Sequence, residues 1–429
     1  MSTAPSASSS KRYVAPAIAG DAAALTPQQR ELLGRVAELG PHWAERAERH
    51  DREASFPREN FDELRAAGLL GLAVPQHCGG LGADFATCVL VVAEMGRWCG
   101  STALSFNMHV NPCLWSGLVA DALDMGAAER AAHERIRARH CERIVGEGRL
   151  YAQPLSEGGA AAALAAPWGT VARKVAGGYV VSGRKIFASM AGAADFYGVL
   201  CTLEPGTESG SGTQRDAIFL AVPAAAAGVS VEGDWDALGM RGTVSRNLRF
   251  ADVHVADDAR LLPEGLYEQA ARRFPHVFTT HAATYLGVAQ AAYDFTVQYL
   301  RAEVPGMPRV PRRQYPTKQH AVAQMRTRLE AARALFLLNA RDARIDPDKD
   351  ARMRLLAAHY TVMEHANDVC RLAVRTCGGQ GMFRHLPLER LYRDSRCGSL
   401  MLPLTAELCM DHLGRECLYE DGEGDEAIE

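Results

Sequence analysis

The chain changes texture twice along its length, from helix-like to strand-like and back to helix-like. Residues from about 25 to 150 are rich in Ala and Leu with interspersed charges and short Gly/Pro breaks, as in amphipathic helices. Residues from about 151 to 260 form short β-branched and aromatic runs separated by Gly, Pro or Asp. Residues from about 262 to 418 are again periodic. This order predicts an α+β fold with an N-terminal helical domain, a central small antiparallel β-barrel or sandwich, and a C-terminal four-helix-bundle domain.

Two local patterns support this division. GTVARKVAGGYVVSGRKIFAS has β-branched and aromatic residues on both sides of a Gly-Gly pair, which predicts two strands joined by a tight turn. In the third region, Phe278, Ala282 and Tyr285 begin an apolar stripe of 3.6-residue period, and residues 322–336 hold another. A third helix is expected from about 351 to 376, where glycines end it.

Shifts in composition set the expected domain boundaries. The first 20 residues are rich in Ser, Ala and Pro and lack the apolar stretch of a secretory signal, which favours disorder. The predicted units are a disordered tail (1–23), an N-terminal helical domain (24–150), a β domain (151–260), a C-terminal helical bundle (261–418) and an acidic tail (419–429).

Charge and cysteine usage exclude several classes of protein. The net charge is −4, with no basic stripe for nucleic acid and no run of about 18 apolar residues to span a membrane. Eleven cysteines are scattered without a CxxC pair, which favours reduced thiols over a disulfide or zinc framework. We therefore expect a cytoplasmic protein that binds small molecules and holds no metal.

Four blocks between residues 53 and 415 carry a family signal. They are FPRENFDELRAAGLLGLAVPQHCGGLG with STALSFNMH after it, GGYVVSGRKIFASMAGAADFYGVL, DWDALGMRGTVSRNLRFADVHV, and CGGQGMFRHLPLERLYRDSRCGSLMLPLTAEL. In this order and spacing they resemble the acyl-CoA dehydrogenase family of flavoproteins. The resemblance implies an oxidoreductase that binds FAD between its β domain and its C-terminal bundle, in a homotetramer.

The resemblance assigns flavin contacts to the β region. Leu155, Ser156 and Glu157 match the family's (V/L)-(T/S)-E run beside the flavin ring. Phe187 and Ser189 match the Trp and Thr of its K-x-W-x-T segment. An aromatic face packs on isoalloxazine, and a hydroxyl or backbone N–H hydrogen-bonds flavin N5 or O4.

Further contacts are implied near the C-terminal end. Gly378, Gly379 and Gly381 match the family's GGxG, whose backbone approaches phosphate or adenosine closely. Arg375 stands where the family usually has Gln, and its guanidinium can pair with phosphate. Thr405 matches the Thr of the family's Glu-Gly-Thr.

Two sets of charged residues are considered. For the first, the residue that binds the FAD pyrophosphate is not chosen, and the second is interpreted as structural. The family's R-x-x-F-G, whose Arg reaches the FAD pyrophosphate of a neighbouring subunit, is absent, and the sequence does not choose among four substitutes: Arg301, Arg309, Arg312 and Arg313. The charges of PLERLYRD are interpreted as a structural ion-pair network: Arg390, Arg393 and Asp394.

The carboxylate that takes the α-proton in acyl-CoA dehydrogenases has no counterpart here. Leu402 or Pro403 takes its place, depending on the alignment, and residues 274–285, where some relatives carry it, include no acidic residue. Glu407 lies one helical turn past the loop and is expected to face the helix surface. The catalytic residue is therefore unknown, and two histidines are candidate proton carriers for which a satisfied structural role is favoured: His281 and His385.

Three hypotheses follow from the resemblance. The first is a flavin oxidoreductase that oxidises an acyl-CoA or carrier-bound acyl group and passes electrons to an electron-transfer flavoprotein. The second is a two-component flavin-dependent monooxygenase of the same fold, with a flavin reductase as partner, an aromatic substrate and FMN in place of FAD. WDALGMRGTVS and the pair Gln153-Pro154 favour this branch. The third is a non-catalytic subunit of a mixed tetramer.

Overall fold

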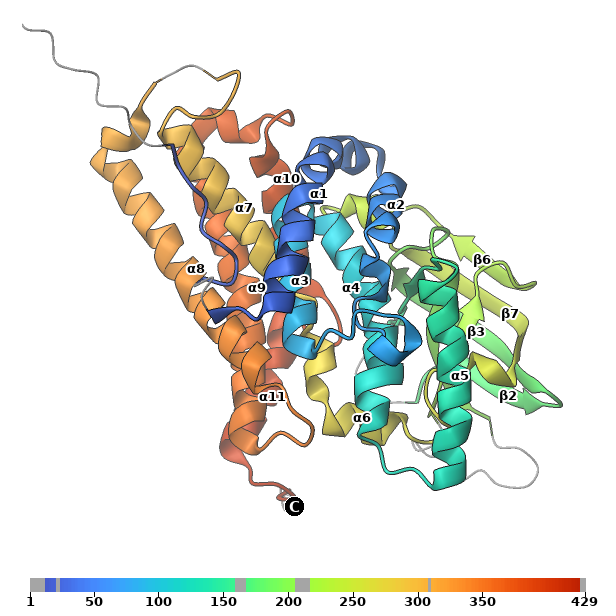
Figure 1. The fold of residues 1–429 in the computed structure, drawn as a ribbon. Helices are drawn as coiled ribbons and strands as arrows, with labels where there is room; N and C mark the ends of the chain where they lie inside the picture. The colour runs from blue at the N-terminus through green and yellow to red at the C-terminus, as the bar shows by residue number, and fades with distance from the viewer. Residues whose placement is uncertain (1–11, 21–23, 159–166, 205–216, 308–309, 425–429) are drawn as a thin grey trace, which may run out of the picture.

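The computed structural model describes residues 12–20, 24–158, 167–204, 217–307 and 310–424. Helices form the first and last parts of the chain, and a sheet lies at one side of the molecule (Figure 1). This arrangement confirms the predicted α+β architecture of a helical, a β and a second helical region. Among the described residues, no helix is both long and apolar enough to cross a membrane.

The N-terminal region is helical, as predicted. Thr26 caps the first helix, because its hydroxyl accepts from the backbone N–H of Gln29 and the Gln29 side chain accepts in return. Asp84 caps the third helix, because its carboxylate accepts from the backbone N–H of Thr87. A π-helical turn, Trp115–Val119, continues the fourth helix. The helices are α1 (Pro27–Glu53), α2 (Arg58–Ala66), α3 (Phe85–Trp98), α4 (Gly100–Leu114) and α5 (Ala127–Val145).

The central region is a seven-stranded sheet in the order β1-β4-β2-β3-β7-β6, with β5 paired to β4. The predicted Gly-Gly hairpin joins β2 to β3. Most pairs are antiparallel, but β4 runs parallel to both β1 and β2, so the sheet is mixed where a wholly antiparallel one was expected. Local patterning carries no information on which distant strands pair. The strands are β1 (Tyr151–Ala152), β2 (Val171–Val175), β3 (Gly178–Ala188), β4 (Phe196–Leu203), β5 (Ala217–Pro223), β6 (Val229–Glu232) and β7 (Arg246–Ala256).

The C-terminal region contains the predicted long helices. The apolar stripe beginning at Phe278 is buried, and the expected third helix extends slightly further at both ends, as α9. The Gly287 backbone touches α3 so closely that a Cβ there would lie 2.2 Å from Ala93 O, which fixes glycine at this crossing. The helices are α6 (Tyr267–Arg273), α7 (Ala282–Leu300), α8 (Pro316–Asp342), α9 (Lys349–Cys377), α10 (Pro387–Cys397) and α11 (Ala406–Leu418).

The described parts of the two predicted tails pack on the helices. Ile18 is buried, and Tyr13 Oη donates to Asp294 at 2.7 Å, so disorder over residues 1–23 is wrong for residues 12–20. Burial of apolar surface holds this segment. In the acidic tail, Asp421 contacts Arg352. Residues 1–11, 21–23 and 425–429 of the two tails lie outside the described part.

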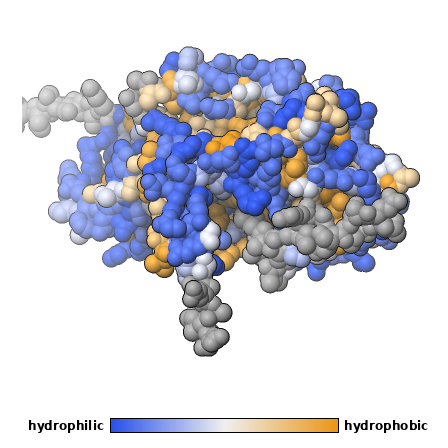
Figure 2. Space-filling model, turned by 90° about the horizontal axis from the view of Figure 1, so that it is seen from below, coloured by the Kyte–Doolittle hydropathy of each residue, from blue (hydrophilic) through white to orange (hydrophobic). Residues whose placement is uncertain are grey.

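The surface and the thiols are those of an ordinary globular protein. Seen from below, hydrophilic side chains cover most of the face, with separate hydrophobic patches between them (Figure 2). All eleven cysteines lie in the described part of the chain, none is paired, and most are buried.

Candidate active site

A cavity of about 370 Å³ lies where the β region meets the N-terminal and C-terminal helices. One wall comes from the β region and its loops, and includes Leu155, Ser156, Phe187, Ser189 and Trp235. A second wall comes from α4, α7 and the segment before α7, and includes Met108, Asn111, Phe278, His281 and Tyr285. The loop before α11 closes one side with Leu400, Met401, Leu402 and Pro403.

A buried ion pair positions the first part of the β wall. Lys185 Nζ lies 2.5 Å from Glu157 Oε1, and the two side chains are 0% and 6% exposed. Glu157 also accepts from the backbone N–H groups of Gly169 and Thr170 at 2.6 and 3.0 Å. Burial lowers the pKa of Lys185, and Glu157 opposes that shift. These contacts fasten the chain beside Ser156 to β3.

The backbone around the cavity is strained. Phe187, Met190, Met240 and Val244 have φ angles of 52°, 62°, 53° and 44°, in the left-handed region that side chains disfavour. The register of β3 against β7 shifts just before Ala188, and this bulge leaves the Phe187 ring 62% exposed at the cavity. Strained residues of this kind cluster at ligand sites.

Three hydroxyl groups form a row on the β wall. Ser189 Oγ lies 2.9 Å from Ser245 Oγ, which lies 2.7 Å from Thr243 Oγ1. Ser245 was not predicted as a site residue. The pairing of β7 with β3 brings it beside Ser189, and no local sequence signal reveals that pairing. Thr243 Oγ1 also donates to the Met240 carbonyl at 2.8 Å. Because each hydroxyl proton is thus used within the row, the row offers acceptor oxygens to a polar ligand edge.

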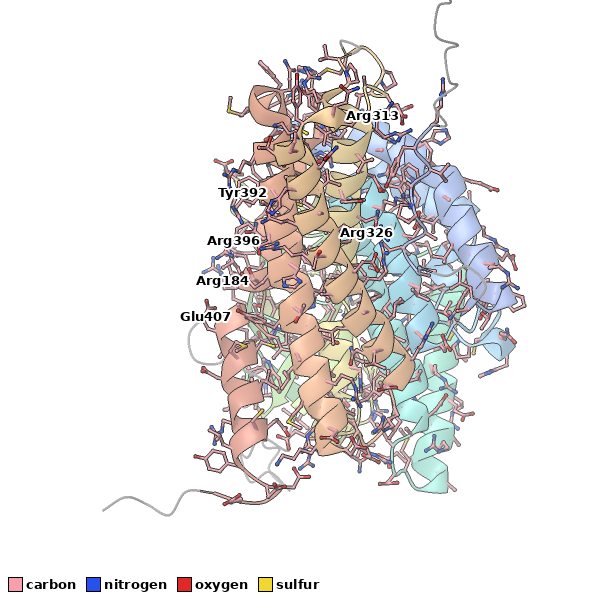
Figure 3. All side chains as sticks on the ribbon, turned by 90° about the vertical axis from the view of Figure 1, so that its left-hand side faces the viewer. Arg184, Arg313, Arg326, Tyr392, Arg396 and Glu407 are labelled. Carbon is pink, nitrogen blue, oxygen red and sulfur yellow. The ribbon has the colours of Figure 1, made fainter. Side chains whose placement is uncertain are left out.

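The cavity contains no charged side chain among the described residues that line it. Leu402 and Pro403 do line it, at the place where the family's carboxylate is expected. Glu407 is exposed at the start of α11, on the outer face of the molecule (Figure 3). His385 is exposed and lies outside the cavity lining. The described part of these walls therefore holds no carboxylate base.

His281 is a cavity residue whose hydrogen bonding is incomplete. It is 4% exposed, and its Nε2 has no hydrogen-bond partner among the described residues. The ring meets that of His359 edge-on, with centroids 4.9 Å apart. Burial lowers the pKa of both rings, that of His359 to about 4, so both are neutral at pH 7. The expectation that His281 is a satisfied structural histidine is therefore wrong.

The remaining expected flavin contacts lie outside this cavity. Gly378 and Gly379 are exposed in the turn η11 (Gly378–Met382), Gly381 is buried in it, and Arg375 is exposed on the last turn of α9. Thr405 caps α11, with Oγ1 accepting from the Leu408 N–H at 3.3 Å. Of the ten matched positions, four line the cavity, and six, including Glu157, do not.

A basic hollow lies near the GGxG turn. Arg313 and Lys318 line a space of about 250 Å³ between α7 and α8, and Lys318 donates to the backbone carbonyl of Thr376. Of the other candidates for the absent family Arg, Arg301 also lines this hollow and pairs with Glu303, and Arg312 lies over the Tyr299 ring. Arg309 lies outside the described residues.

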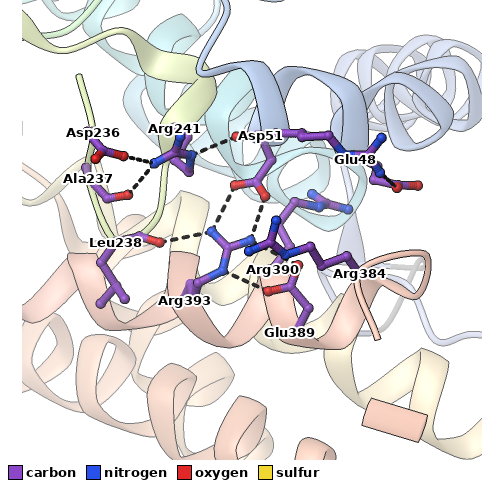
Figure 4. Close-up of a pocket in the computed structure, with 11 residues that line it drawn as sticks. Glu48, Asp51, Asp236, Ala237, Leu238, Arg241, Arg384, Glu389, Arg390 and Arg393 are labelled. Carbon is purple, nitrogen blue, oxygen red and sulfur yellow. Dashed lines mark hydrogen bonds and ion pairs between the residues drawn. The ribbon is translucent and has the colours of Figure 1, made fainter. Parts of the chain in front are cut away.

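A charged pocket adjoins the cavity through Ala237 and Leu238, which line both (Figure 4). Arg393 binds both carboxylate oxygens of Asp51, at 3.0 and 2.5 Å, and Glu389 at 2.8 Å. Burial raises the pKa of Asp394 to about 6, while Arg390 opposes the shift. These contacts support the structural interpretation of the PLERLYRD charges.

The same charged network holds the loop that lies between the charged pocket and the cavity. Asp394 accepts from the Met240 N–H at 2.5 Å. A Cβ on Gly239 would lie 2.5 Å from the Arg393 backbone, so the loop packs directly on α10. The loop that separates pocket from cavity is therefore held from the charged side.

Three family models match the chain. "Acyl-CoA dehydrogenase, N-terminal domain" matches residues 26–120, the middle domain matches residues 152–253, and the C-terminal domain matches residues 279–400. Together they cover more than half of the chain.

Individual relatives include enzymes of different chemistries. The chain is 29% identical to the putative acyl-CoA dehydrogenase YdbM of Bacillus subtilis, covering 86% of this chain and 92% of YdbM. It is 31% identical to the L-evernosamine nitrososynthase of a Micromonospora species, covering 94% and 93%. The structure of KijD3 in complex with FMN and dTDP-3-amino-2,3,6-trideoxy-4-keto-3-methyl-D-glucose matches with a TM-score of 0.76 and 25% identity, covering 93% and 96%.

Proposed function

The chain belongs to the acyl-CoA dehydrogenase family, and from this premise we propose that it is a two-component flavin-dependent monooxygenase that oxidises an amine nitrogen. The observation that carries the proposal is the lack of a carboxylate among the described residues that line the cavity. Oxidation of an acyl thioester requires a base within reach of the α-proton. Oxidation at nitrogen requires a neutral amine, and a cavity without charged side chains favours that form, because burying an ammonium ion without a partner is costly.

The β wall fits a flavin ring. Phe187 offers an exposed aromatic face, and the hydroxyl row of Ser189, Thr243 and Ser245 offers acceptor oxygens to an N–H at the polar edge of the ring. Leu155 and Ser156 complete this wall. When bound, the flavin supplies two-electron redox chemistry and, in its reduced form, reacts with oxygen.

The residues outside the cavity serve the phosphate end of a flavin held by a neighbouring copy in a homotetramer. Arg375, Gly378, Gly379 and Gly381 lie together at the end of α9, beside the hollow lined by Arg313. FAD uses this second surface, and FMN does not reach so far. We place the protein in the cytoplasm, where its eleven free cysteines stay reduced.

The relatives support nitrogen oxidation. The nitrososynthase is 31% identical over nearly the whole chain, and KijD3 binds FMN together with a nucleotide-linked amino sugar. A second candidate is the oxidation of an acyl-CoA with an electron-transfer flavoprotein as partner. The 29% identity to a putative acyl-CoA dehydrogenase favours it.

The test separates these activities on one preparation. The purified protein is titrated anaerobically with acyl-CoAs of several chain lengths while flavin bleaching is followed. In parallel, oxygen and NADH consumption are measured with a flavin reductase, FMN or FAD, and the amino sugar nucleotide bound by KijD3. Amine-dependent turnover that requires the reductase supports the proposal. Bleaching by an acyl-CoA supports the dehydrogenase, and absence of flavin binding points to a non-catalytic subunit.

A further inference from the structure

Two arginines of the charged pocket have no hydrogen-bond or ion-pair partner in the described part of the chain: Arg384 and Arg390. Figure 4 shows both among the residues that line this pocket of about 260 Å³. Both also line an adjoining hollow of about 530 Å³, which lies between α1, α7 and the start of α10. Arg384 is exposed, but Arg390 is only 8% exposed. Because a buried cation without a partner is costly, Arg390 requires an anion.

The other charged side chains of the pocket already have partners. They pair with one another: Arg393 with Asp51 and Glu389, Arg241 with Asp236, and Arg52 with Glu48. Arg390 opposes the raised pKa of Asp394, so the two groups attract, but no ion pair joins them. The structural interpretation of PLERLYRD therefore holds for Arg393 and Asp394 and not for Arg390. Two guanidinium groups remain outside the pairs of the pocket.

The adjoining hollow adds the positive end of a helix. Pro387, the first residue of α10, lines it, and no side chain caps this helix. The partial positive charge at a helix N-terminus attracts anions. Two further carboxylates line the hollow: Asp294, which Arg97 binds, and Glu45, which is exposed to water. The unpaired charge that is buried here is therefore positive.

We propose that Arg390, assisted by Arg384, binds a phosphate group of a small-molecule ligand where the charged pocket meets the adjoining hollow. A phosphate group carries about −1.5 to −2 charges at pH 7, which two guanidinium groups match better than they match a single carboxylate. The planar fork of arginine also binds two phosphate oxygens at once.

Two ligands of the proposed reaction carry such a group. One is FMN, and the other is a nucleotide-linked substrate, whose reacting end would enter the cavity. Both are near enough in principle, because Ala237 and Leu238 line the charged pocket and the cavity alike. Phosphate binding itself does not depend on the oxidation chemistry, so its test is separate from that of the proposed function.

Calorimetric titration with inorganic pyrophosphate tests the site on the flavin-free protein. Arg390→Met should weaken pyrophosphate binding about ten- to a hundredfold, the effect of losing charge-assisted hydrogen bonds in a buried position. Arg384→Met should weaken it about threefold, because an exposed charge contributes less. Arg390→Lys, which keeps the charge and loses the fork, should retain part of the affinity. Pyrophosphate should also raise the melting temperature of the wild type and not that of Arg390→Met.

Arg52→Met is the matched control. It removes the same charge from the same pocket, but Arg52 is exposed and paired with Glu48, so pyrophosphate affinity should change less than about twofold. Equal weakening in Arg52→Met and Arg390→Met would show a diffuse effect of charge and overturn the site, as would absence of pyrophosphate binding to the wild type. If Arg390→Met does not fold, unchanged affinity in both Arg390→Lys and Arg384→Met overturns it.

Two further titrations identify the source of the phosphate. An Arg390-dependent preference for thymidine diphosphate over thymidine assigns the site to a nucleotide-linked substrate. An Arg390-dependent preference for FMN over riboflavin assigns it to the flavin. Pyrophosphate binding that depends on Arg390, in a protein without amine-dependent turnover, would leave the site standing and overturn the proposed function alone.

Discussion

The charged pocket around Arg393 and the cavity beside it share part of one loop but have opposite character. In the pocket, Arg393 and Arg241 are bound by carboxylates and backbone carbonyls that they also fix in place. In the cavity, charges are missing from the described lining, the backbone is strained at Phe187 and Met240, and His281 has an orphaned nitrogen. The difference teaches that a dense group of charges marks a structural network when its members satisfy one another, and that unsatisfied or strained groups mark the site.

Removing Arg393 should cost the most stability. Arg393→Met leaves the carboxylates of Asp51 and Glu389 without their partner in a largely buried position, and we expect the free energy of unfolding to fall by about 2 to 4 kcal/mol. Urea denaturation measures this. Arg52→Met, which breaks the exposed pair with Glu48 at the same pocket, should cost less than about 1 kcal/mol. Equal losses in the two variants would contradict the structural role of Arg393.

Lowering the pH should change the stability contributions of the two regions in opposite directions. Burial lowers the pKa of His359 to about 4 from an unfolded value of 6.5, so its contribution to stability is present above pH 6.5 and is lost as the pH falls through 4. Asp394, with its pKa raised to about 6 from 3.8, contributes stability below pH 3.8 that is lost as the pH rises through 6. Each contribution is about 3 kcal/mol.

Urea denaturation between pH 7.5 and 4 checks this pair of signs. His359→Gln should make the acid-induced loss of stability shallower, because it removes a group that must take up a proton on unfolding. Asp394→Asn should make the loss steeper. Parallel pH profiles for both variants and the wild type would show that neither group is perturbed as described.

Relieving backbone strain at the cavity should leave the stability of the protein unchanged or higher while it lowers flavin affinity. Phe187→Gly removes the cost of a left-handed side-chain residue, so the stability of the flavin-free protein should stay the same or rise by up to about 1 kcal/mol. Flavin affinity should fall about tenfold with the loss of the aromatic face. Asp252→Gly relieves a similar φ of 51° outside the cavity lining and should leave flavin affinity unchanged. Fluorescence titration with FMN measures both.

The smallest effect is expected at Glu407. This residue is exposed in the first turn of α11, away from the cavity, so Glu407→Gln should change stability by less than about 0.5 kcal/mol and leave turnover intact. Steady-state oxygen consumption with the reductase and amine measures turnover. Loss of turnover with flavin still bound would identify Glu407 as a catalytic base and favour the conventional dehydrogenase.

Local sequence determined the elements and the family. Apolar periodicity placed α7, α8 and α9, the Gly-Gly pair placed the β2–β3 hairpin, and four motif blocks indicated an acyl-CoA dehydrogenase relative without its carboxylate. These features depend on residues within a few turns of one another, where propensity and capping act. The cavity position of Leu155, Ser156, Phe187 and Ser189 could also be predicted, because motifs carry it.

Only the tertiary structure decided which distant groups meet. The pairing of β7 with β3 placed Ser245 beside Ser189, and the packing of α9 near the start of α7 brought His359 to His281. It also separated the GGxG turn from the cavity and packed Ile18 where disorder was expected. Such contacts depend on the summed burial of surfaces far apart in the chain, which local patterns do not encode. The sequence thus determined that the family's carboxylate is missing from its expected position, and the tertiary structure determined which side chains line the cavity there.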